Sequence, residues 1–228
     1  PPALYALGPQ AQGVAVRLGP NPAGGDVPAF TPDGSRMVYA APSPDGTDLF
    51  VADLNGGEPV RITRDGRRKL QPAVSPDGRW VATSRWTPGA WLDVVILDAA
   101  TGRTVSRVTE DRAMDLAVAW SPDGRWLLWG SDRSGTHNVV AVAMDPERGR
   151  PVGELRMVTN VPTAAAYPSV APASVPGGPW VYYSGYHVDG WEVERVPFEP
   201  ERWAPALPVH LRAPTAPPVT PRPRPWPP

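Results

Sequence analysis

The residues of this chain that could do chemistry are few and widely spaced. Its three histidines, His137, His187 and His210, show neither the His-x-x-x-His nor the Glu-x-x-His spacing that pairs zinc ligands. Tyr183-Ser184-Gly185-Tyr186 contains a serine, but a hydrolase elbow needs Gly-x-Ser-x-Gly on a strained turn. Asn55-Gly56-Gly57 is typical of a hairpin turn and not of a phosphate loop. The sequence therefore predicts no catalytic residue, no metal site and no cofactor.

One triplet, Ser131-Asp132-Arg133, places an acid beside an arginine at a predicted turn. In a functional interpretation the two charges grip a peptide terminus. In a structural interpretation Asp132 accepts backbone N–H groups within the turn, and Arg133 pairs with a neighbouring carboxylate. Three further aspartates, Asp33, Asp77 and Asp123, are turn residues first and candidate cation ligands second.

Composition excludes several classes of function. The 228 residues include no cysteine, so there is no disulfide, thiolate metal site or cysteine nucleophile. The formal net charge of −1 favours neither a nucleic-acid partner nor an anionic membrane surface. No apolar run approaches the roughly 18 residues that span a bilayer, so this segment is not expected to insert into a membrane. The 33 prolines and 22 glycines predict many turns.

A repeated turn motif organises the chain. Its residue order is that of a type I turn: Ser or Thr can bond the backbone two residues on, Pro presets φ, Asp tolerates the third place and Gly closes the fourth. The aspartates of the first three copies are 44 and 46 residues apart. The copies are Thr31-Pro32-Asp33-Gly34, Ser75-Pro76-Asp77-Gly78, Ser121-Pro122-Asp123-Gly124 and a degraded Val175-Pro176-Gly177-Gly178.

The same succession of short β-forming stretches follows each turn. After the second copy come Arg79-Trp80-Val81-Ala82, then residues 94–98, and then residues 106–109. With the stretch before the turn, each unit has four short antiparallel strands over about 45 residues, which matches a β-propeller blade. Trp80, Trp126 and Trp180 share one position of the repeat, where we expect them to pack between sheets and not to stack on a ligand.

We therefore predict an all-β fold, a β-propeller of four-stranded antiparallel blades with about four to four and a half blades present. Near the start, residues 3–7 and 16–19 match the third and fourth strands of a blade, and residues 209–212 match a last fourth strand. The register predicts the C-terminal half of a preceding blade (1–25), three blades (26–66, 67–112 and 113–160), a degenerate blade (161–212) and a proline-rich linker or tail (213–228).

This count suggests a segment of a larger protein with further domains, because propellers usually close with four to eight complete blades. A strained ring of four or five blades is the alternative. The tail, residues 213–228, is half proline and indicates an extended polyproline stretch. It would serve as a spacer to a following domain or as a ligand for a proline-recognising domain.

The third copy of the repeat resembles the blades of TolB-like propellers, a WD-type family of six or seven blades. Residues 120–138 read WSPDGRWLLWGSDRSGTHN and precede a strand that ends in Met144-Asp145. The resemblance covers residues 26–160 closely and 161–212 loosely. It implies a bacterial protein of the periplasm or another extracytoplasmic space. The sequence lacks a visible TolB N-terminal domain and carries a proline-rich tail, which favours a module of a larger envelope-associated protein.

The resemblance leaves two classes of function open. In the first, loops on one propeller face bind a protein or peptide, with no catalysis in this chain. In the second, the propeller gates substrates for a prolyl-oligopeptidase-like serine peptidase whose catalytic domain lies elsewhere. We predict the first. Exposed arginines and aromatic residues are common binding hot spots, so the candidate partner-binding residues are Arg85, Trp86, Trp91, Arg133, His137 and His187.

Overall fold

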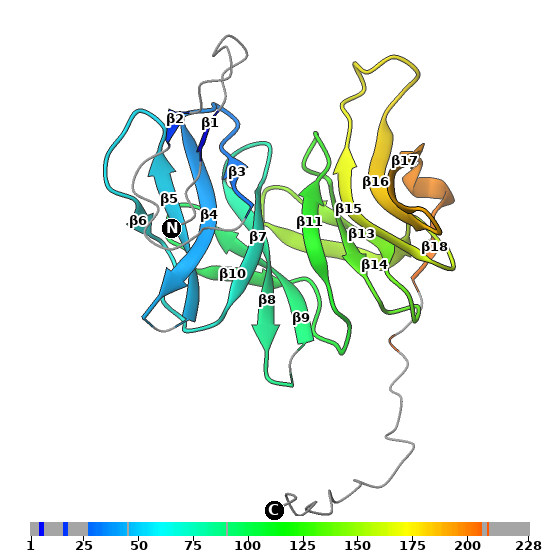
Figure 1. Ribbon diagram of the computed structural model, residues 1–228, viewed down its shortest axis with the longest axis horizontal. Coiled ribbons are helices and arrows are strands. Elements are labelled where there is room, and N and C mark those ends of the chain that lie inside the picture. The colour runs from blue at the N-terminus through cyan, green and yellow to red at the C-terminus, as the bar shows by residue number, and fades with distance from the viewer. Residues whose placement is uncertain are drawn as a thin grey trace, which may run out of the picture.

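The computed structural model consists almost entirely of antiparallel strands and describes residues 5–6, 16–17, 27–44, 46–89, 91–206 and 209. Besides a two-stranded sheet near the N-terminus, four sheets follow one another in chain order, from the blue sheet at the left of Figure 1 to the yellow and orange one at the right. The predicted all-β propeller architecture of four-stranded antiparallel blades is confirmed. None of the helices in the described part has the length and apolar character needed to cross a membrane.

Consecutive strands are hydrogen-bonded neighbours within every sheet. The first sheet contains β3 (Ala29–Phe30), β4 (Arg36–Ser43), β5 (Gly46–Asp53) and β6 (Val60–Arg61); the second contains β7 (Lys69–Val74), β8 (Trp80–Thr87), β9 (Trp91–Asp98) and β10 (Thr104–Arg107); the third contains β11 (Leu116–Trp120), β12 (Trp126–Ser131), β13 (Asn138–Asp145) and β14 (Arg150–Met157); the fourth contains β15 (Ala164–Val170), β16 (Trp180–His187) and β17 (Gly190–Pro197).

The repeated turn joins the first and second strands of successive sheets, and its residues act as the sequence predicts. In the second sheet the N–H of Gly78 donates to the carbonyl of Ser75 at 2.9 Å, and Gly78 has a left-handed φ of 75°. The Ser75 hydroxyl donates to Asp77 at 2.5 Å and accepts the N–H of Trp80 at 2.9 Å. Ser121 and Asp123 repeat these bonds one sheet later.

The first strands of the second, third and fourth sheets share a backbone irregularity. Gln71 in β7, Ala117 in β11 and Tyr167 in β15 all have positive φ, between 48° and 58°, where the register with the second strand shifts. Such bulges redirect side chains at the cost of local strain. The Gln71 side chain uses this direction to accept the N–H of Ala117 at 3.0 Å, which ties β7 to β11.

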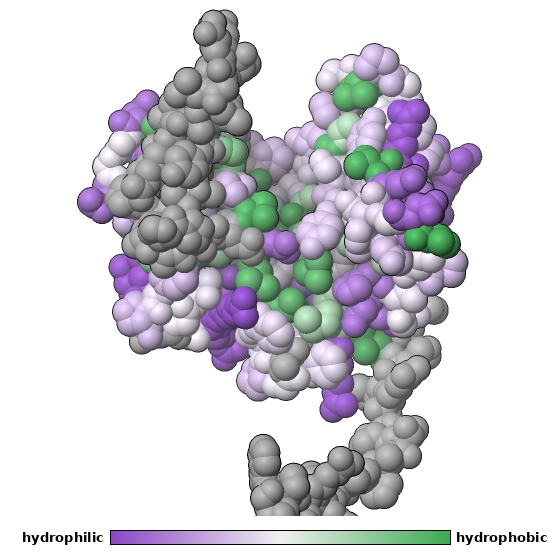
Figure 2. Space-filling view, viewed as in Figure 1, coloured by the Kyte–Doolittle hydropathy of each residue, from purple (hydrophilic) through white to green (hydrophobic). Residues whose placement is uncertain are grey.

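The core lies between neighbouring sheets. Trp80 belongs to a buried cluster with residues of the third sheet, including Trp120 and Trp129, and its indole N–H donates to the carbonyl of Pro146 at 2.7 Å. The predicted packing role of Trp80 is therefore confirmed. Figure 2 shows hydrophobic residues gathered in the middle of one face and hydrophilic residues toward its rim.

The two ends of the chain add short strands. β1 (Tyr5–Ala6) pairs with β2 (Val16–Arg17), the two stretches that the repeat register identifies as successive strands. After β17 the chain forms one turn of 3-10 helix, η1 (Pro200–Arg202), and then β18 (Ala204–Pro205). β18 pairs with β14 of the third sheet and not with β17. The strand predicted at residues 209–212 lies outside the described residues apart from Val209, which is not in a strand.

Candidate functional site

Three equivalent junctions follow the first, second and third sheets. At each junction, a polar residue early in the third strand of one sheet has two neighbours. One is a threonine just after the fourth strand, and the other is the residue at the start of the next sheet. The polar residues are Asp48, Asp93 and Asn138. The threonine hydroxyls at these junctions accept the N–H of the residue that follows the polar one, at 2.8–3.0 Å. We call these the first, middle and last junctions.

At the first junction the buried carboxylate is fully hydrogen-bonded and paired with positive charge. Asp48 is fully buried and accepts hydrogen bonds from Ser43 at 2.7 Å, Arg61 at 2.6 Å and Thr63 at 2.6 Å. The ammonium of Lys69, also fully buried, lies 3.4 Å from the same carboxylate. Burial alone would raise the pKa of Asp48, but these hydrogen bonds and the Lys69 charge outweigh it, so the pKa is lowered.

The last junction is complete without any charge. Asn138 is buried, and its amide oxygen accepts the Thr159 hydroxyl at 3.0 Å and the N–H of Val161 at 2.8 Å. Its amide nitrogen donates to the carbonyl of Val161 at 3.2 Å and to two hydroxyls, those of Ser134 and Thr136. Every polar group of this buried side chain is therefore satisfied.

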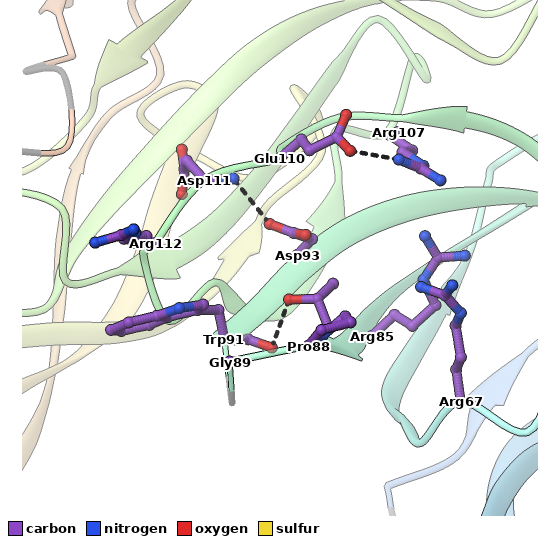
Figure 3. A pocket seen from close by; sticks show the side chains of 11 residues that line it. Arg67, Arg85, Pro88, Gly89, Trp91, Asp93, Arg107, Glu110, Asp111 and Arg112 are labelled. Carbon is purple, nitrogen blue, oxygen red and sulfur yellow. Dashed lines mark hydrogen bonds and ion pairs between the residues drawn. The ribbon is translucent and has the colours of Figure 1, made fainter. Parts of the chain in front are cut away.

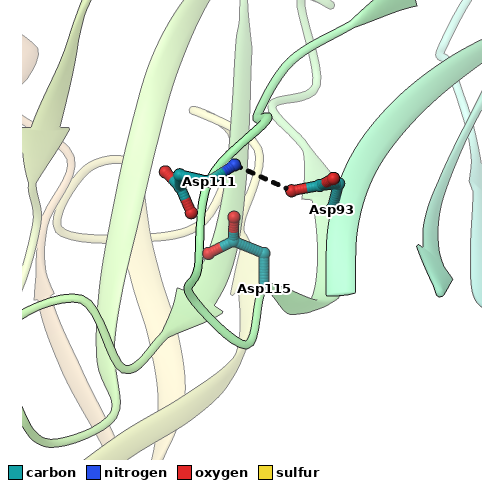
Figure 4. A group of neighbouring side chains, drawn as sticks. All are labelled: Asp93, Asp111 and Asp115. Carbon is teal, nitrogen blue, oxygen red and sulfur yellow. Dashed lines mark hydrogen bonds between the residues drawn. The ribbon is translucent and has the colours of Figure 1, made fainter. Parts of the chain in front are cut away.

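The middle junction gathers three acids. Asp93 takes the place of Asp48, and Asp115 takes the place of Lys69, so a carboxylate faces a carboxylate where the first junction has an ion pair. Asp111 completes the group, and one oxygen of each acid lies within 4.8 Å of the others (Figure 4). Arg133 neutralises part of this charge, with Nη2 3.3 Å from both Asp111 and Asp115.

Asp93 receives much less support than its equivalent in the first junction. Its carboxylate accepts the backbone N–H of Asp111, at 3.2 Å. Burial raises the pKa of Asp93, and the neighbouring charges of Asp111, Asp115 and Glu110 add to that rise. Burial also raises the pKa of Asp115, against the attraction of Arg133. A buried acid in this state is a frequent mark of a functional site.

Arg85 is the second unsatisfied charge of the middle junction. It pairs with Asp93 in the strand register, yet its side chain is only 6% exposed and it makes weak contacts. Nη1 lies 3.4 Å from the Thr104 hydroxyl and 3.9 Å from Asp65, while Nε is buried without a partner among the described residues. Burial lowers the pKa of Arg85, and the like charge of Arg67 lowers it further.

These groups border an open pocket of about 570 Å³. Figure 3 shows the pocket walled by Trp91 and Arg112 on one side, by Asp93 in the middle, and by Arg67 and Arg85 on the other side. A second hollow of about 550 Å³ adjoins it, because Trp91 and Arg112 line both. The second hollow extends along the loop that contains Asp132 and Arg133. Together they form one trough, which we call the arginine trough.

All six predicted partner-binding residues lie at or near the turns between second and third strands. The structure brings three of them, Arg85, Trp91 and Arg133, to the arginine trough. The other three line neither hollow: Trp86 is half-buried in β8, His137 is half-buried before β13, and exposed His187 bonds Glu194 at 2.8 Å. Whether any of the six contacts a partner stays a prediction.

One premise of that prediction is wrong, because Arg85 and Arg133 are not exposed. They are 5% and 6% exposed. Arg133 is paired with Asp111 and Asp115 of the middle junction, whereas Arg85 lies 3.4 Å from Thr104 and 3.9 Å from Asp65.

The structural interpretation of the Ser131-Asp132-Arg133 triplet is confirmed for Arg133, which pairs with Asp111 and Asp115. Asp132 does accept a backbone N–H, at 2.8 Å, but the donor is Met114 and not a residue of its own turn as predicted.

Sequence reasoning missed the remaining charges of the trough. Arg67 and Arg112 occupy the segments that lead from one sheet to the next, Arg107 ends β10, and no motif marks any of the three. Asp93 and Asp115 did leave a signal. Aligning the repeats places Asp93 opposite Asp48 and Asp115 opposite Lys69, so a charge reversal at one position of the repeat was visible in the sequence.

Comparisons with known proteins agree on the fold. A family model described as "TolB beta propeller domain" matches residues 27–173. The structure of "putative TolB" from Agrobacterium tumefaciens aligns over 84% of this chain and 65% of its own, with a TM-score of 0.64 and 18% identity. TolB from Acinetobacter baumannii aligns over 82% of this chain and 47% of its own, with a TM-score of 0.60 and 18% identity. The chain thus spans less than two thirds of either relative.

A peptidase shares the same architecture. The puromycin-hydrolyzing peptidase of Mycobacterium tuberculosis aligns over 90% of this chain and 32% of its own, with a TM-score of 0.56 and 18% identity. At such identity these likenesses concern the fold alone. No curated protein sequence matches this chain.

Proposed function

Because the chain belongs to the TolB β-propeller domain family, we propose that it is a non-catalytic scaffold that binds a protein or peptide. The observation that carries the proposal is the arginine trough. It combines a concave surface with an aromatic wall at Trp91 and incompletely paired charge at Arg85 and Asp93. Interfaces between proteins are enriched in arginine and tryptophan, which makes this trough the best-equipped surface for a partner.

We propose that the scaffold is one module of a larger envelope-associated protein in an extracytoplasmic space. The support is the family match together with the shorter length of this chain relative to both TolB structures. In this setting the partner is a protein or peptide and not a nucleic acid, in line with the net charge of −1.

Site-specific photo-crosslinking tests the proposal. A benzophenone amino acid at position 112, on the exposed wall of the trough, is expected to give one discrete protein adduct in cells of the source organism. The Trp91→Ala change should remove that adduct. The same amino acid at position 125, exposed on the opposite end of the third sheet, should give none. Equal adducts from both positions, or an adduct that survives Trp91→Ala, would contradict the proposal.

The second candidate function is a substrate gate of a prolyl-oligopeptidase-like serine peptidase. The likeness to the mycobacterial peptidase over 90% of this chain favours it. The two candidates differ in what else the native polypeptide contains. If a fluorophosphonate probe labels the native polypeptide, detected with an antibody to this segment, the gate is supported. Absence of labelling, alongside an active control hydrolase in the same extract, supports the scaffold.

A further inference from the structure

We propose that the pocket between Arg67, Arg85 and Arg107 binds a carboxylate group of the partner. The inference rests on the proposed scaffold function and gives it a ligand chemistry. The pocket is the part of the arginine trough formed by the β8–β9 hairpin and residues 107–112. The hydrogen-bond donor to the carboxylate is the guanidinium of Arg85, which the chain itself leaves under-bonded.

The guanidinium of Arg85 has few hydrogen-bond partners within the part of the chain that the structure describes. Among the described residues, Nε has no partner and Nη1 has only long contacts of 3.4 Å and 3.9 Å. Asp65, the acid at 3.9 Å, is already bound by the ammonium of Lys69. A guanidinium has five N–H donors, so a side chain that is 94% buried with so few acceptors favours an external anion.

The charged side chains that line the pocket differ in how well they are paired. Arg67 and Arg112 are exposed and make no side-chain ion pair within the described part of the chain. Arg107 pairs with Glu110, but both are mostly solvent-exposed, and such pairs contribute little and exchange readily. Asp111 is paired with Arg133. What the pocket leaves uncompensated is therefore mainly positive, with Asp93 as the opposing charge.

Three guanidinium groups lie close together in the pocket. Figure 3 shows Arg67, Arg85 and Arg107 at one end of the pocket, with Arg67 and Arg85 side by side. Burial lowers the pKa of Arg85, and Arg67 and Arg107 lower it further against the attraction of Asp65 and Asp93. The like charges of these three guanidinium groups repel one another. An oxyanion between them would reverse the sign of that interaction.

The acids in the same pocket select a carboxylate over a phosphate. Asp93, Glu110 and Asp111 offset three of the four arginines that line it, which leaves a net formal charge of +1, so a single negative charge balances the pocket and a dianion exceeds it. Arginine also matches the planar, two-oxygen geometry of a carboxylate. In a peptide partner this group is either the C-terminal carboxylate or the side chain of Asp or Glu.

Titration calorimetry of the 228-residue chain with four probes tests the proposal. The probes are acetyl-triglycine with a free carboxylate, the same peptide with a C-terminal amide, acetyl-Gly-Glu-Gly-amide, and inorganic phosphate. We expect at least one carboxylate probe to bind about tenfold or more tightly than the neutral amide. Binding of the free acid alone identifies a peptide C-terminus, and binding of the glutamate peptide identifies an acidic side chain.

Three variants make the test specific. Arg85→Met should weaken the bound probe about tenfold or more, and Arg67→Gln, at an exposed position that cannot disturb the core, should weaken it a few-fold. Arg125→Gln removes an exposed arginine from the opposite end of the third sheet and should change nothing. Equal binding of all three peptides, tighter binding of phosphate than of either acid, or wild-type binding by both pocket variants would overturn the proposal.

The outcome separates this proposal from the scaffold function. If Arg85→Met leaves the position 112 adduct intact and no carboxylate probe binds, the carboxylate site is refuted and the scaffold stands. If carboxylate probes bind through Arg85 but no protein adduct forms, the carboxylate site stands and the scaffold is refuted.

Discussion

Asp48 and Asp93 occupy the same position of two successive sheets, and their surroundings are opposite. Asp48 faces Lys69 and accepts three further side-chain hydrogen bonds. Asp93 faces Asp115 and accepts a backbone N–H. The pKa of the first acid is lowered and that of the second is raised. One backbone design therefore supports both a structural ion pair and a strained group of acids beside an under-bonded arginine.

The comparison identifies the middle junction as the one whose buried charges are not arranged for stability. A repeat position that is satisfied in two junctions and unsatisfied in the third breaks a local rule, and such breaks concentrate at functional sites. The first and last junctions use different chemistry, an ion pair and an amide, but both provide hydrogen-bond partners for the buried side chain at this position, Asp48 or Asn138. The middle junction is thus the exception that the proposed binding site explains.

The largest effect is expected from Arg133→Met at the middle junction. Removing this guanidinium leaves the fully buried Asp115 without its countercharge, which should lower the free energy of unfolding by about 3 kcal/mol at pH 7. The loss should shrink in acid, where Asp115 becomes protonated. Urea unfolding at pH 7 and pH 4 measures both. An unchanged midpoint at pH 7 would mean that Arg133 does not support this junction.

A smaller loss is expected from Lys69→Met at the first junction. Asp48 keeps Arg61, Ser43 and Thr63 when the ammonium is removed, and Asp65 is partly solvated. The free energy of unfolding should therefore fall by about 1–2 kcal/mol, less than for Arg133→Met. Urea unfolding of the two variants side by side checks the order. A larger loss for Lys69→Met would reverse the roles assigned to the two junctions.

Arg85→Met should not lower the free energy of unfolding, in contrast to Arg133→Met and Lys69→Met. The substitution removes a buried charge with long contacts and replaces it with a side chain that suits the site, so stability should stay equal or rise by up to about 1 kcal/mol. Thermal unfolding measures the change, with the exposed Arg125→Met as the matched control. A clear loss of stability with Arg85→Met alone would show that Arg85 is a structural residue and not a binding one.

The smallest effect concerns pH. The folded-state pKa of Asp93 is raised above the ordinary 3.8, so its ionisation destabilises the fold as the pH rises through that raised value. Asp93→Asn should therefore stabilise the chain by about 1 kcal/mol at pH 7 and by nothing measurable near pH 3. Unfolding at both pH values tests this, and a gain that persists near pH 3 would assign it to packing instead of charge.

The repeat made the fold predictable. Ser75 and Asp77 set the turn through local hydrogen bonds, and the same letters recur at each blade, so strand order and sheet type followed from residues close in sequence. The position of β18 on β14 did not follow, because its pairing with Met157 and Arg156 links segments far apart in the chain. A short strand with two residues carries no periodic signal of its own.

The candidate site was only partly predictable. Trp91 and Arg133 drew attention because they lie at turns, and both reach the trough. The burial of Arg85 was not foreseeable from its turn position, because it depends on residues such as Asp65 and Thr104, which the fold brings beside it from other strands and loops. Which charges meet is decided by the loops between sheets, whose lengths differ from one repeat to the next. Of these charges, only the change from Lys69 to Asp115 at one position of the repeat could be recognised in the sequence.

One substitution made at two equivalent positions tests the central claim most directly. Asp48→Asn and Asp93→Asn change the same atom at the same place in successive sheets, and their urea unfolding at pH 7 can be compared directly. The account predicts that Asp48→Asn lowers the free energy of unfolding by at least about 2 kcal/mol, because Lys69 and Arg61 lose the buried carboxylate that they share, while Asp93→Asn leaves it equal or higher. Similar losses in both variants would contradict it.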